Sequence, residues 1–331
     1  MKTKEIIGID VSKSNIDLCI HSKQIVAKFQ NSKKGFRAML DWVLKNSIYP
    51  LQETIFVFEN TGMYSHRLSV FLMEKQLFFF IASGLDIKRS LGIVRGKEDQ
   101  VDAKRIAIYG YRLKEELEPS ELPDTSIIKL KSLLSLRTKL NKQRAGFKAT
   151  LKEQKRIYTV QEFKINFQVQ QKMILEITKQ IDKINGAMKI IIDEHAALKQ
   201  TYELVTSVKG IGMQTALNVI AYTDNFKKFE NWRKFASYCG IAPFPYQCGT
   251  SIKGKTKVSH LANKKLKAIM NMCAITAIQH SPEMKSYYQK RVAQGKNKMS
   301  TVNIIRNKLV ARMFAVVKRQ TPYVDLLKFA A

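Results

Sequence analysis

The segment Glu5–Ser12 (EIIGIDVS) constrains the fold more than any other, because it is a short apolar run that carries one acid at its far end. Ile6, Ile7 and Ile9 are β-branched residues, which fit a buried, pleated strand. Asp10 interrupts the run, and a carboxylate in such a strand costs free energy unless a partner compensates it. A divalent metal ion is a common partner. The alternative is a lone aspartate that ends the strand or caps a turn.

Three further acids stand where they can share a metal ion with Asp10. Glu59 ends a second apolar strand, predicted at Thr54–Glu59 (TIFVFE). Asp99 and Asp102 lie three residues apart in KEDQVDAK, and this spacing puts both on one face of a helix. Four carboxylates can hold two Mg²⁺ about 4 Å apart, the arrangement used for phosphodiester chemistry. Oxygen ligands alone favour Mg²⁺ or Mn²⁺ over zinc.

Helix and strand patterns predict an α/β N-terminal part followed by helical parts. Strands are expected at 5–11, 16–21, 24–30, 54–59 and 77–82, and helices at 36–44, 64–75 and 99–116. This order implies a mixed sheet flanked by helices. The acidic segment Glu115–Pro123 (EELEPSELP) is typical of a domain boundary. We therefore expect an α/β domain at 1–118, a helical arm at 124–200 and a basic, mainly α domain at 201–331.

The positive charge of the chain is large and unevenly distributed. The formal net charge is +30, and residues 1–123 hold 19 Lys and Arg against 15 Asp and Glu. Residues 124–331 hold 38 against 12, an excess of 26. Such an excess on one part of a folded chain indicates a polyanionic partner, most simply nucleic acid. The alternative is a solvated, lysine-rich surface.

The segment between Pro123 and Pro243 contains no proline, so long helices can run through it. Apolar residues there alternate steps of three and four, the spacing of a heptad seam: Ile174, Ile177, Ile181, Ile184, Met188 and Ile191. The second arm of an antiparallel hairpin or coiled coil is expected to use Leu130, Leu133, Leu136 or Arg137, and Leu140. Such an arm either joins protomers or is an ordinary helical core.

Two segments of the last third have the composition of nucleic-acid contacts. VKGIG, followed by a helix, resembles a helix-hairpin-helix turn, whose backbone N–H groups hold a phosphate; its candidate residues are Lys209, Gly210 and Gly212. Further on, Pro243, Pro245 and Gly249 favour a loop, and lysines follow it closely. The candidate phosphate contacts are Lys253, Lys255, Lys257, Lys264 and Lys265. The alternative for the first segment is an ordinary turn between helices.

The cysteines and the N-terminus point to a reducing compartment. Cys19, Cys239, Cys248 and Cys273 show neither CxxC nor zinc-ligand spacing. The first residues, MKTKEIIGID, carry no signal-peptide pattern, and no apolar run is long enough to span a membrane. We therefore expect a cytoplasmic protein.

Taken in order, these segments resemble one known family. Asp10, then Glu59 in FENTG, then KEDQVDAKRIA resemble the ribonuclease H/RuvC-like domain of the DEDD transposases of the IS110 insertion-sequence family, which are related to the Piv-type invertases. VKGIGMQTA resembles the GIG…TA segment of this family, and CGIAPFPYQCGTSIKGKTKVSHLANKKLK resembles its G-x-x-P…SSG segment. The resemblance extends from Ile6 to about Tyr323.

The resemblance implies a DNA transposase or recombinase that cuts and exchanges strands. It implies that Mg²⁺ is coordinated by Asp10, Glu59, Asp99 and Asp102. It also implies that a serine of the C-terminal domain attacks DNA and forms a covalent phosphoserine. A guide RNA encoded by the element, a multimer that joins donor and target DNA, and a place at the bacterial nucleoid are further implications.

The chain departs from the family pattern at the nucleophile. Where the family has a serine directly before a glycine, this chain has Cys248. A thiol beside several lysines is readily converted to the nucleophilic thiolate, so Cys248 is one candidate. Ser251, three residues on, is the second candidate, and an impaired enzyme is the third interpretation.

Two other functions fit the same residues. A RuvC-like junction nuclease would use metal-activated water and would form no covalent adduct with DNA. A non-enzymatic nucleic-acid-binding protein would use the four acids only for structure. In that case, Asp10→Asn and Asp99→Asn would leave every activity in place.

Overall fold

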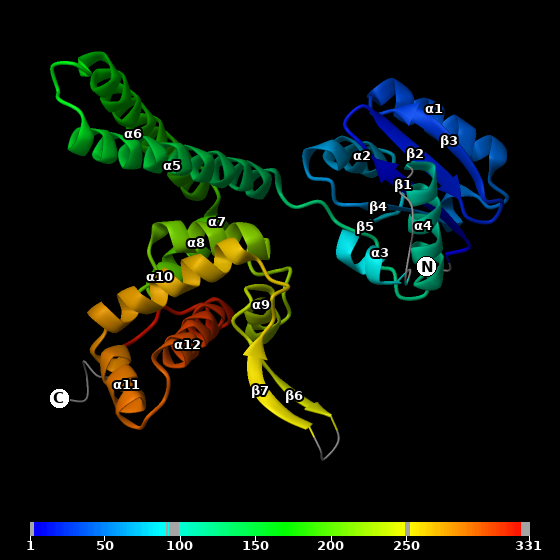
Figure 1. Ribbon diagram of the computed structural model, residues 1–331. Coiled ribbons are helices and arrows are strands. Elements are labelled where there is room, and N and C mark those ends of the chain that lie inside the picture. The colour runs from blue at the N-terminus through cyan, green and yellow to red at the C-terminus, as the bar shows by residue number, and fades with distance from the viewer. Residues whose placement is uncertain (1–2, 91, 93–98, 249–251, 326–331) are drawn as a thin grey trace. The chain divides into compact units, whose positions relative to one another are not determined.

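The computed structural model describes residues 3–90, 92, 99–248 and 252–325 (Figure 1). The chain divides into two compact units, Met1–Leu122 and Pro123–Ala331. Each unit has a hydrophobic core of its own. Within the described ranges, none of the helices combines the length and the apolar composition that a membrane span requires.

The first unit is built on a five-stranded mixed sheet. Its strands are β1 (Glu5–Val11), β2 (Asn15–Ile20), β3 (Ile25–Gln30), β4 (Thr54–Glu59) and β5 (Phe79–Ala82), in the spatial order β3-β2-β1-β4-β5. The central strand β1 pairs antiparallel with β2 and parallel with β4. Ile7 and Ile9 are fully buried there, as expected for β-branched residues in a central strand. The α/β class predicted for the N-terminal part is confirmed.

Helices cover both faces of this sheet. They are α1 (Lys33–Asn46), α2 (Met63–Glu74), α3 (Gly84–Ser90) and α4 (Asp99–Arg112), and the short 3-10 helix η1 (Leu51–Glu53) precedes β4. Phe36 of α1 and Leu68 of α2 share a core with Ile9, on one face. Ile106 of α4 shares a second core with Ile6, on the other face (Figure 1). The sequence did not predict α3, because seven residues are too few to show a helical period.

Helix α4 approaches β1 closely because small residues face each other. A Cβ built on Gly8 of β1 would lie 2.3 Å from the backbone nitrogen of Ala107 and 2.5 Å from the carbonyl oxygen of Ala103. A Cβ built on Gly110 of α4 would lie 2.8 Å from Cγ2 of Ile6. These contacts show the direction of α4, which runs antiparallel to β1. Its first residues lie near the end of β1, and Gly110 lies near Ile6 at the start of β1.

The second unit begins with two long helices, α5 (Thr125–Ile157) and α6 (Lys164–Asp193), which pack against each other as a hairpin (Figure 1). Four of the predicted seam residues are buried on α6: Ile177, Ile181, Ile184 and Met188. On α5 the buried apolar residues are Ile127, Leu130 and Leu134. The two helices therefore pack along the apolar seam of α6 that the spacing predicted.

The structure decides one position of the seam that the sequence left open between Leu136 and Arg137. Leu136 is 46% exposed, so it lies outside the seam. Its alternative, Arg137, donates Nε–H to Oδ1 of Asn185 on α6 at 2.8 Å. The seam is therefore polar at this level. Asn185 accepts a hydrogen bond from the Arg137 guanidinium, which would lack a partner among apolar side chains.

The rest of the second unit is mainly helical, as predicted. The helices are α7 (Ala196–Thr206), α8 (Met213–Thr223), α9 (Trp232–Tyr238), α10 (Lys264–His280), α11 (Pro282–Ala293) and α12 (Lys298–Arg319). They pack around one core, which includes Val205, Phe235, Met270 and Leu309.

The loop expected after Pro243 is instead a two-stranded antiparallel hairpin. Its strands are β6 (Pro243–Cys248) and β7 (Ile252–Val258), with an irregular register between Phe244 and Tyr246. Both strands are edges, and an edge strand tolerates proline because its outward N–H groups need no partner. The irregularity lies at Pro245, which has no N–H to donate.

Candidate active site

Asp10 and Glu59 occupy neighbouring positions at the same end of the sheet. The parallel strands β1 and β4 register Ile9 with Phe58, and each acid stands one residue beyond this pair. Neighbouring strands lie about 4.8 Å apart, and successive side chains alternate between the two faces. Both acids therefore point to the face that α4 covers, and both are partly exposed. Two carboxylates thus emerge side by side from the carboxyl ends of two central strands.

The packing of α4 brings Asp102 toward the same end. Ala103 and Ala107 lie over Gly8, and Asp10 stands two residues further along β1, roughly 7 Å at the rise of a strand. The first turn of α4 precedes Ala103, and at about 1.5 Å per residue it also extends roughly 7 Å from Gly8 toward the end of β1 where Asp10 lies. Asp102, which belongs to that turn, therefore lies toward the carboxylates of the sheet.

The second helix acid is only partly described. Asp102 is partly buried and accepts a hydrogen bond from Nη1 of Arg105 at 2.6 Å. Asp99 is the first residue of α4, and its side chain lies outside the described residues. The backbone thus brings Asp10, Glu59 and the N-terminal turn of α4 to one end of the sheet.

The sequence reading missed a carboxylate beside Asp10. Asp17 lies on β2 in register with Asp10, and Oδ2 of Asp17 is 3.7 Å from Nζ of Lys28 on β3. Its side chain is almost completely buried. Like charges at paired positions repel each other, so a cation near Asp10 and Asp17 would stabilise this part of the sheet. The signal was present, because Asp17 interrupts an apolar strand just as Asp10 does.

Helix α3, which the sequence did not predict, borders Glu59. A Cβ built on Gly84, the first residue of α3, would lie 2.0 Å from Oε1 of Glu59. A larger residue at this position would therefore displace the Glu59 carboxylate. The carboxylate is thus directed by the chain that follows β5.

The candidate nucleophiles belong to the β6–β7 hairpin. Cys248 ends β6, and its backbone pairs with that of Ile252 at the start of β7. The side chains of Cys248 and Lys253 lie outside the described residues, and so does the whole of Ser251. The strand pairing nevertheless shows that Cys248 stands at the last register position before the turn of this hairpin.

The lysines that follow the hairpin turn differ in exposure. Lys255 and Lys257 are exposed on β7, and Lys264 is exposed at the start of α10. Lys265 is partly buried, and burial lowers the pKa of its ammonium group; the nearby positive charge of Arg137 lowers it further. Lys255, Lys257 and Lys264 can therefore contact a polyanion from solvent, whereas the side chain of Lys265 is partly enclosed by the protein.

The predicted VKGIG turn joins α7 and α8. Gly210 has a φ of +92°, a left-handed conformation that favours glycine, and a Cβ there would lie 2.8 Å from Cβ of Ala277 on α10. Gly212 is the N-cap of α8. The glycines therefore serve both the tight turn and the close approach of α10.

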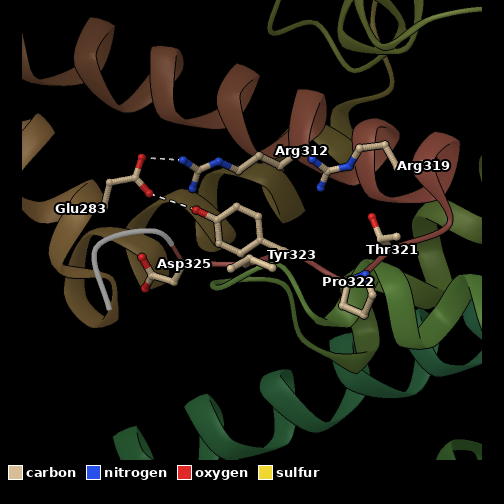
Figure 2. A pocket seen from close by; sticks show the side chains of 8 residues that line it. Glu283, Arg312, Arg319, Thr321, Pro322, Tyr323 and Asp325 are labelled. Atoms are coloured by element: carbon tan, nitrogen blue, oxygen red, sulfur yellow. Dashed lines mark hydrogen bonds and ion pairs between the residues drawn. The ribbon is translucent and has the colours of Figure 1, made fainter. Parts of the chain in front are cut away.

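A protein carboxylate contacts the lysine of this turn. Nζ of Lys209 lies 2.6 Å from Oδ2 of Asp325, in the segment that follows α12. Figure 2 shows how that segment is held: the Tyr323 hydroxyl donates to Oε2 of Glu283 at 3.1 Å, and Arg312 pairs with the same carboxylate. Lys209, a predicted phosphate contact, thus has an acid of the chain itself as its partner.

Comparisons with known proteins agree on one family. Residues 7–159 match the DEDD transposase domain of IS110 elements, and residues 202–289 match the domain described as Transposase IS116/IS110/IS902 family. The chain belongs to the IS110 family of transposases. It is therefore a DNA transposase or recombinase, and DNA is its partner. This confirms the resemblance found in the sequence.

The relatives of this IS110-family transposase include DNA-inverting proteins. Pilin gene-inverting proteins of Moraxella bovis and Moraxella lacunata are each 26% identical to it over 328 residues, which cover 97% of this chain and 98% of theirs. A 43.6 kDa protein of insertion element IS110 from Streptomyces coelicolor is 28% identical over 120 residues, or 36% of this chain and 29% of that protein.

Membership of the DEDD transposases implies the use of a divalent metal ion. Within the described ranges, no three His, Cys, Asp or Glu side chains are grouped closely enough to hold one. The donors nevertheless fit a hard cation, because they are all carboxylate oxygens at one end of the sheet.

Proposed function

We propose that this IS110-family transposase cuts and exchanges DNA strands with Mg²⁺ or Mn²⁺ held by Asp10, Glu59, Asp99 and Asp102. The observation that carries the proposal is the side-by-side position of Asp10 and Glu59 on parallel strands. A bound divalent cation stabilises negative charge on the attacking and leaving oxygens. A sheet in which an antiparallel meander is continued by parallel strands supports the ribonuclease H/RuvC-like fold of the N-terminal domain, 1–118.

The nucleophile of the proposed reaction comes from the C-terminal domain, 201–331. Cys248 or Ser251 attacks a DNA phosphorus and loses its proton. A bond from sulfur or oxygen to phosphorus forms, and the bond to one sugar oxygen breaks. That oxygen takes up a proton and leaves as a hydroxyl. Attack by a hydroxyl of another strand then releases the protein, so the number of phosphodiester bonds is unchanged.

The proposal includes two further partners at the nucleoid of the bacterial cytoplasm. The excess of 26 positive charges in residues 124–331 supports a guide RNA in addition to DNA. A homo-oligomer, either a dimer or a tetramer, is supported by apolar side chains near the distal end of the arm, 124–200. Ile157, Val160, Ile165 and Val169 are 74%, 64%, 74% and 53% exposed there.

The test is a search for a covalent protein–DNA adduct. The protein is incubated with DNA of the element ends, the flanking transcript and Mg²⁺, and the adduct is mapped by peptide mass. We expect it on Cys248 or Ser251. Asp10→Asn and Glu59→Gln should each lower adduct formation by about 1,000-fold or more, because charge stabilisation by the metal is lost.

Asp41→Asn is the matched control, because Asp41 is an exposed acid on α1. It should leave adduct formation unchanged. Cleavage without any adduct would contradict the covalent mechanism and favour a nuclease that uses activated water. Full activity of Asp10→Asn would contradict the metal site itself.

A further inference from the structure

Helix α5 carries a large excess of positive charge. Its 33 residues contain ten Lys and Arg and one acid, Glu153. Where α5 meets α8 and α10, a pocket of about 340 Å³ opens. Its lining includes Lys131, Thr138, Lys139 and Lys142 of α5, Tyr222 of α8 and Lys265 of α10. Four ammonium groups from two helices therefore surround one hollow.

The spacing on α5 directs these lysines into a single track. Lys131, Ser135, Lys139 and Lys142 follow one another in steps of three or four residues, which places them on one helix face. From Lys131 to Lys142 the track is on the order of 16 Å long at the rise of an α-helix. Such a length exceeds one small anion and suits successive phosphates of a strand.

The opposite wall of the pocket combines a cation with an aromatic ring. Nζ of Lys265 lies 5.7 Å from the centroid of the Tyr222 ring. The Tyr222 hydroxyl is protonated at neutral pH and can donate a hydrogen bond, and burial raises its pKa further. Lysine and tyrosine together are a common surface for a nucleic-acid strand, since one contacts phosphate and the other sugar or base.

The charge in the pocket is not balanced by nearby acids. Among the described residues, none of the four lysines takes part in an ion pair of 4 Å or less. Burial and the charge of Lys228 lower the pKa of Lys131, which Asp224 opposes only in part. Around the C-terminal segment, by contrast, Glu283 neutralises Arg312 (Figure 2). An anion in the α5 pocket would remove repulsion that the protein alone leaves in place.

We propose that this pocket binds the sugar–phosphate backbone of a nucleic-acid strand at the junction of α5, α8 and α10. The inference rests on the proposed function only in taking the strand to be the DNA substrate or an RNA partner. It adds a contact surface on the arm that lies outside both the carboxylate group and the β6–β7 hairpin. Contacts from lysine to phosphate carry no sequence information, so this surface positions a strand without selecting its sequence.

The test compares two double variants that remove equal charge from the same helix. Lys139→Gln with Lys142→Gln changes the pocket, and Lys148→Gln with Lys152→Gln changes exposed lysines of α5 beyond it. Binding is measured by fluorescence anisotropy in EDTA with three probes of equal length: single-stranded DNA, duplex DNA and a stem-loop RNA. All four lysines are exposed, so both variants should fold; thermal melting checks this.

We expect the pocket variant to bind at least one probe about tenfold more weakly, with the slope of log affinity against log salt reduced by roughly 1.5. The control variant should lose less than threefold. The probe that loses affinity identifies the strand as RNA, single-stranded DNA or duplex DNA. Equal losses in both variants, or no loss in either, would overturn the proposal. Because EDTA prevents metal-dependent chemistry, a failed adduct experiment leaves this result interpretable.

Discussion

At the scale of single residues, the absence of a side chain at Gly8 decides where the acids lie. The backbone of α4 passes so close to β1 that a Cβ on Gly8 would overlap backbone atoms of Ala103 and Ala107. Backbone atoms of a packed helix cannot move aside as the end of a flexible side chain can. The distance between the acids of the sheet and those of α4 therefore depends on this glycine.

Gly8→Ala should destabilise the protein by about 3 kcal/mol, the upper part of the usual range for overpacking. Denaturant unfolding followed by circular dichroism measures this change. Gly146→Ala is the control, because no atom lies within 4 Å of a Cβ built there and the residue is in the interior of α5. It should stabilise by roughly 0.5–1 kcal/mol, since alanine favours a helix. A smaller effect of Gly8→Ala than of Gly146→Ala would refute the close packing.

Lys131 is expected to show a conflict between stability and binding. Burial lowers the pKa of Lys131, so the folded protein releases this proton at a lower pH than the unfolded chain does. Because the unfolded state then binds more protons, the contribution of Lys131 to stability rises with pH across this interval. Below it, the buried charge costs free energy in full.

Lys131→Met should therefore raise the melting temperature at pH 7, where the lysine is charged, and the gain should shrink as the pH approaches 10. The same variant should weaken nucleic-acid binding. Scanning calorimetry at several pH values and anisotropy measure the two effects. A melting temperature that falls at pH 7 would show that the ammonium group stabilises the free protein.

At the scale of elements, the α5–α6 hairpin depends on a narrow buried seam. Met188 is completely buried, whereas Ile190, two residues on, is 58% exposed on the same helix. Both residues lie in the last three turns of α6, so they share one helix and differ mainly in how deeply their side chains are buried. They therefore separate the effect of the seam from the effect of helix propensity.

Met188→Ala should cost about 2–4 kcal/mol, because it removes buried methylene groups and leaves a cavity. Ile190→Ala should change stability by less than about 0.5 kcal/mol. Thermal unfolding of both variants provides the comparison. Equal losses would mean that Ile190 is buried in solution, for example against a second copy of the chain.

At the scale of the whole molecule, the segment after α12 connects to the turn before α8 across 116 residues of sequence. The ion pair between Lys209 and Asp325 holds the two together and lowers the positive charge that the turn presents. Since one carboxylate oxygen resembles a phosphate oxygen to a lysine, nucleic acid must compete with Asp325 for Lys209.

Asp325→Asn should raise affinity for short duplex DNA by roughly two- to tenfold at low salt, because Lys209 then meets no competing charge. The loss of stability should stay below about 1 kcal/mol, as for other partly exposed ion pairs. Anisotropy titrations at 50 and 200 mM salt measure the effect, which should diminish at the higher salt. Unchanged affinity at both concentrations would show that the turn takes no part in binding.

Much of the fold follows from local patterns of the sequence. The strand Thr54–Glu59 and the strand Glu5–Val11 were predicted with their observed bounds, because a short apolar run and β-branching are properties of neighbouring residues. The α5–α6 seam was predicted for the same reason. The β6–β7 hairpin was not, because prolines near a strand indicate a loop unless both strands are edges.

The candidate site was only partly readable. The sequence identified Asp10, Glu59 and Asp102 by residue type and spacing, and their catalytic roles stay predictions. It did not pair Asp17 with Asp10, although the two strands are consecutive, because the register of the β1–β2 hairpin depends on where its turn begins and ends. Lys131 gave no more signal than any other lysine of the arm.

The sequence by itself determined which segments become strands and helices, where the charge lies and to which family the chain belongs. Each of these properties depends on neighbouring residues or on the order of motifs along the chain. Only the tertiary structure decided that Asp17 stands beside Asp10, that α4 descends onto Gly8 and that Lys131 and Lys265 share one pocket. The last two pairings join residues far apart along the chain, and the first depends on the register of a hairpin. They exist only after the cores have closed, when close packing fixes which surfaces meet.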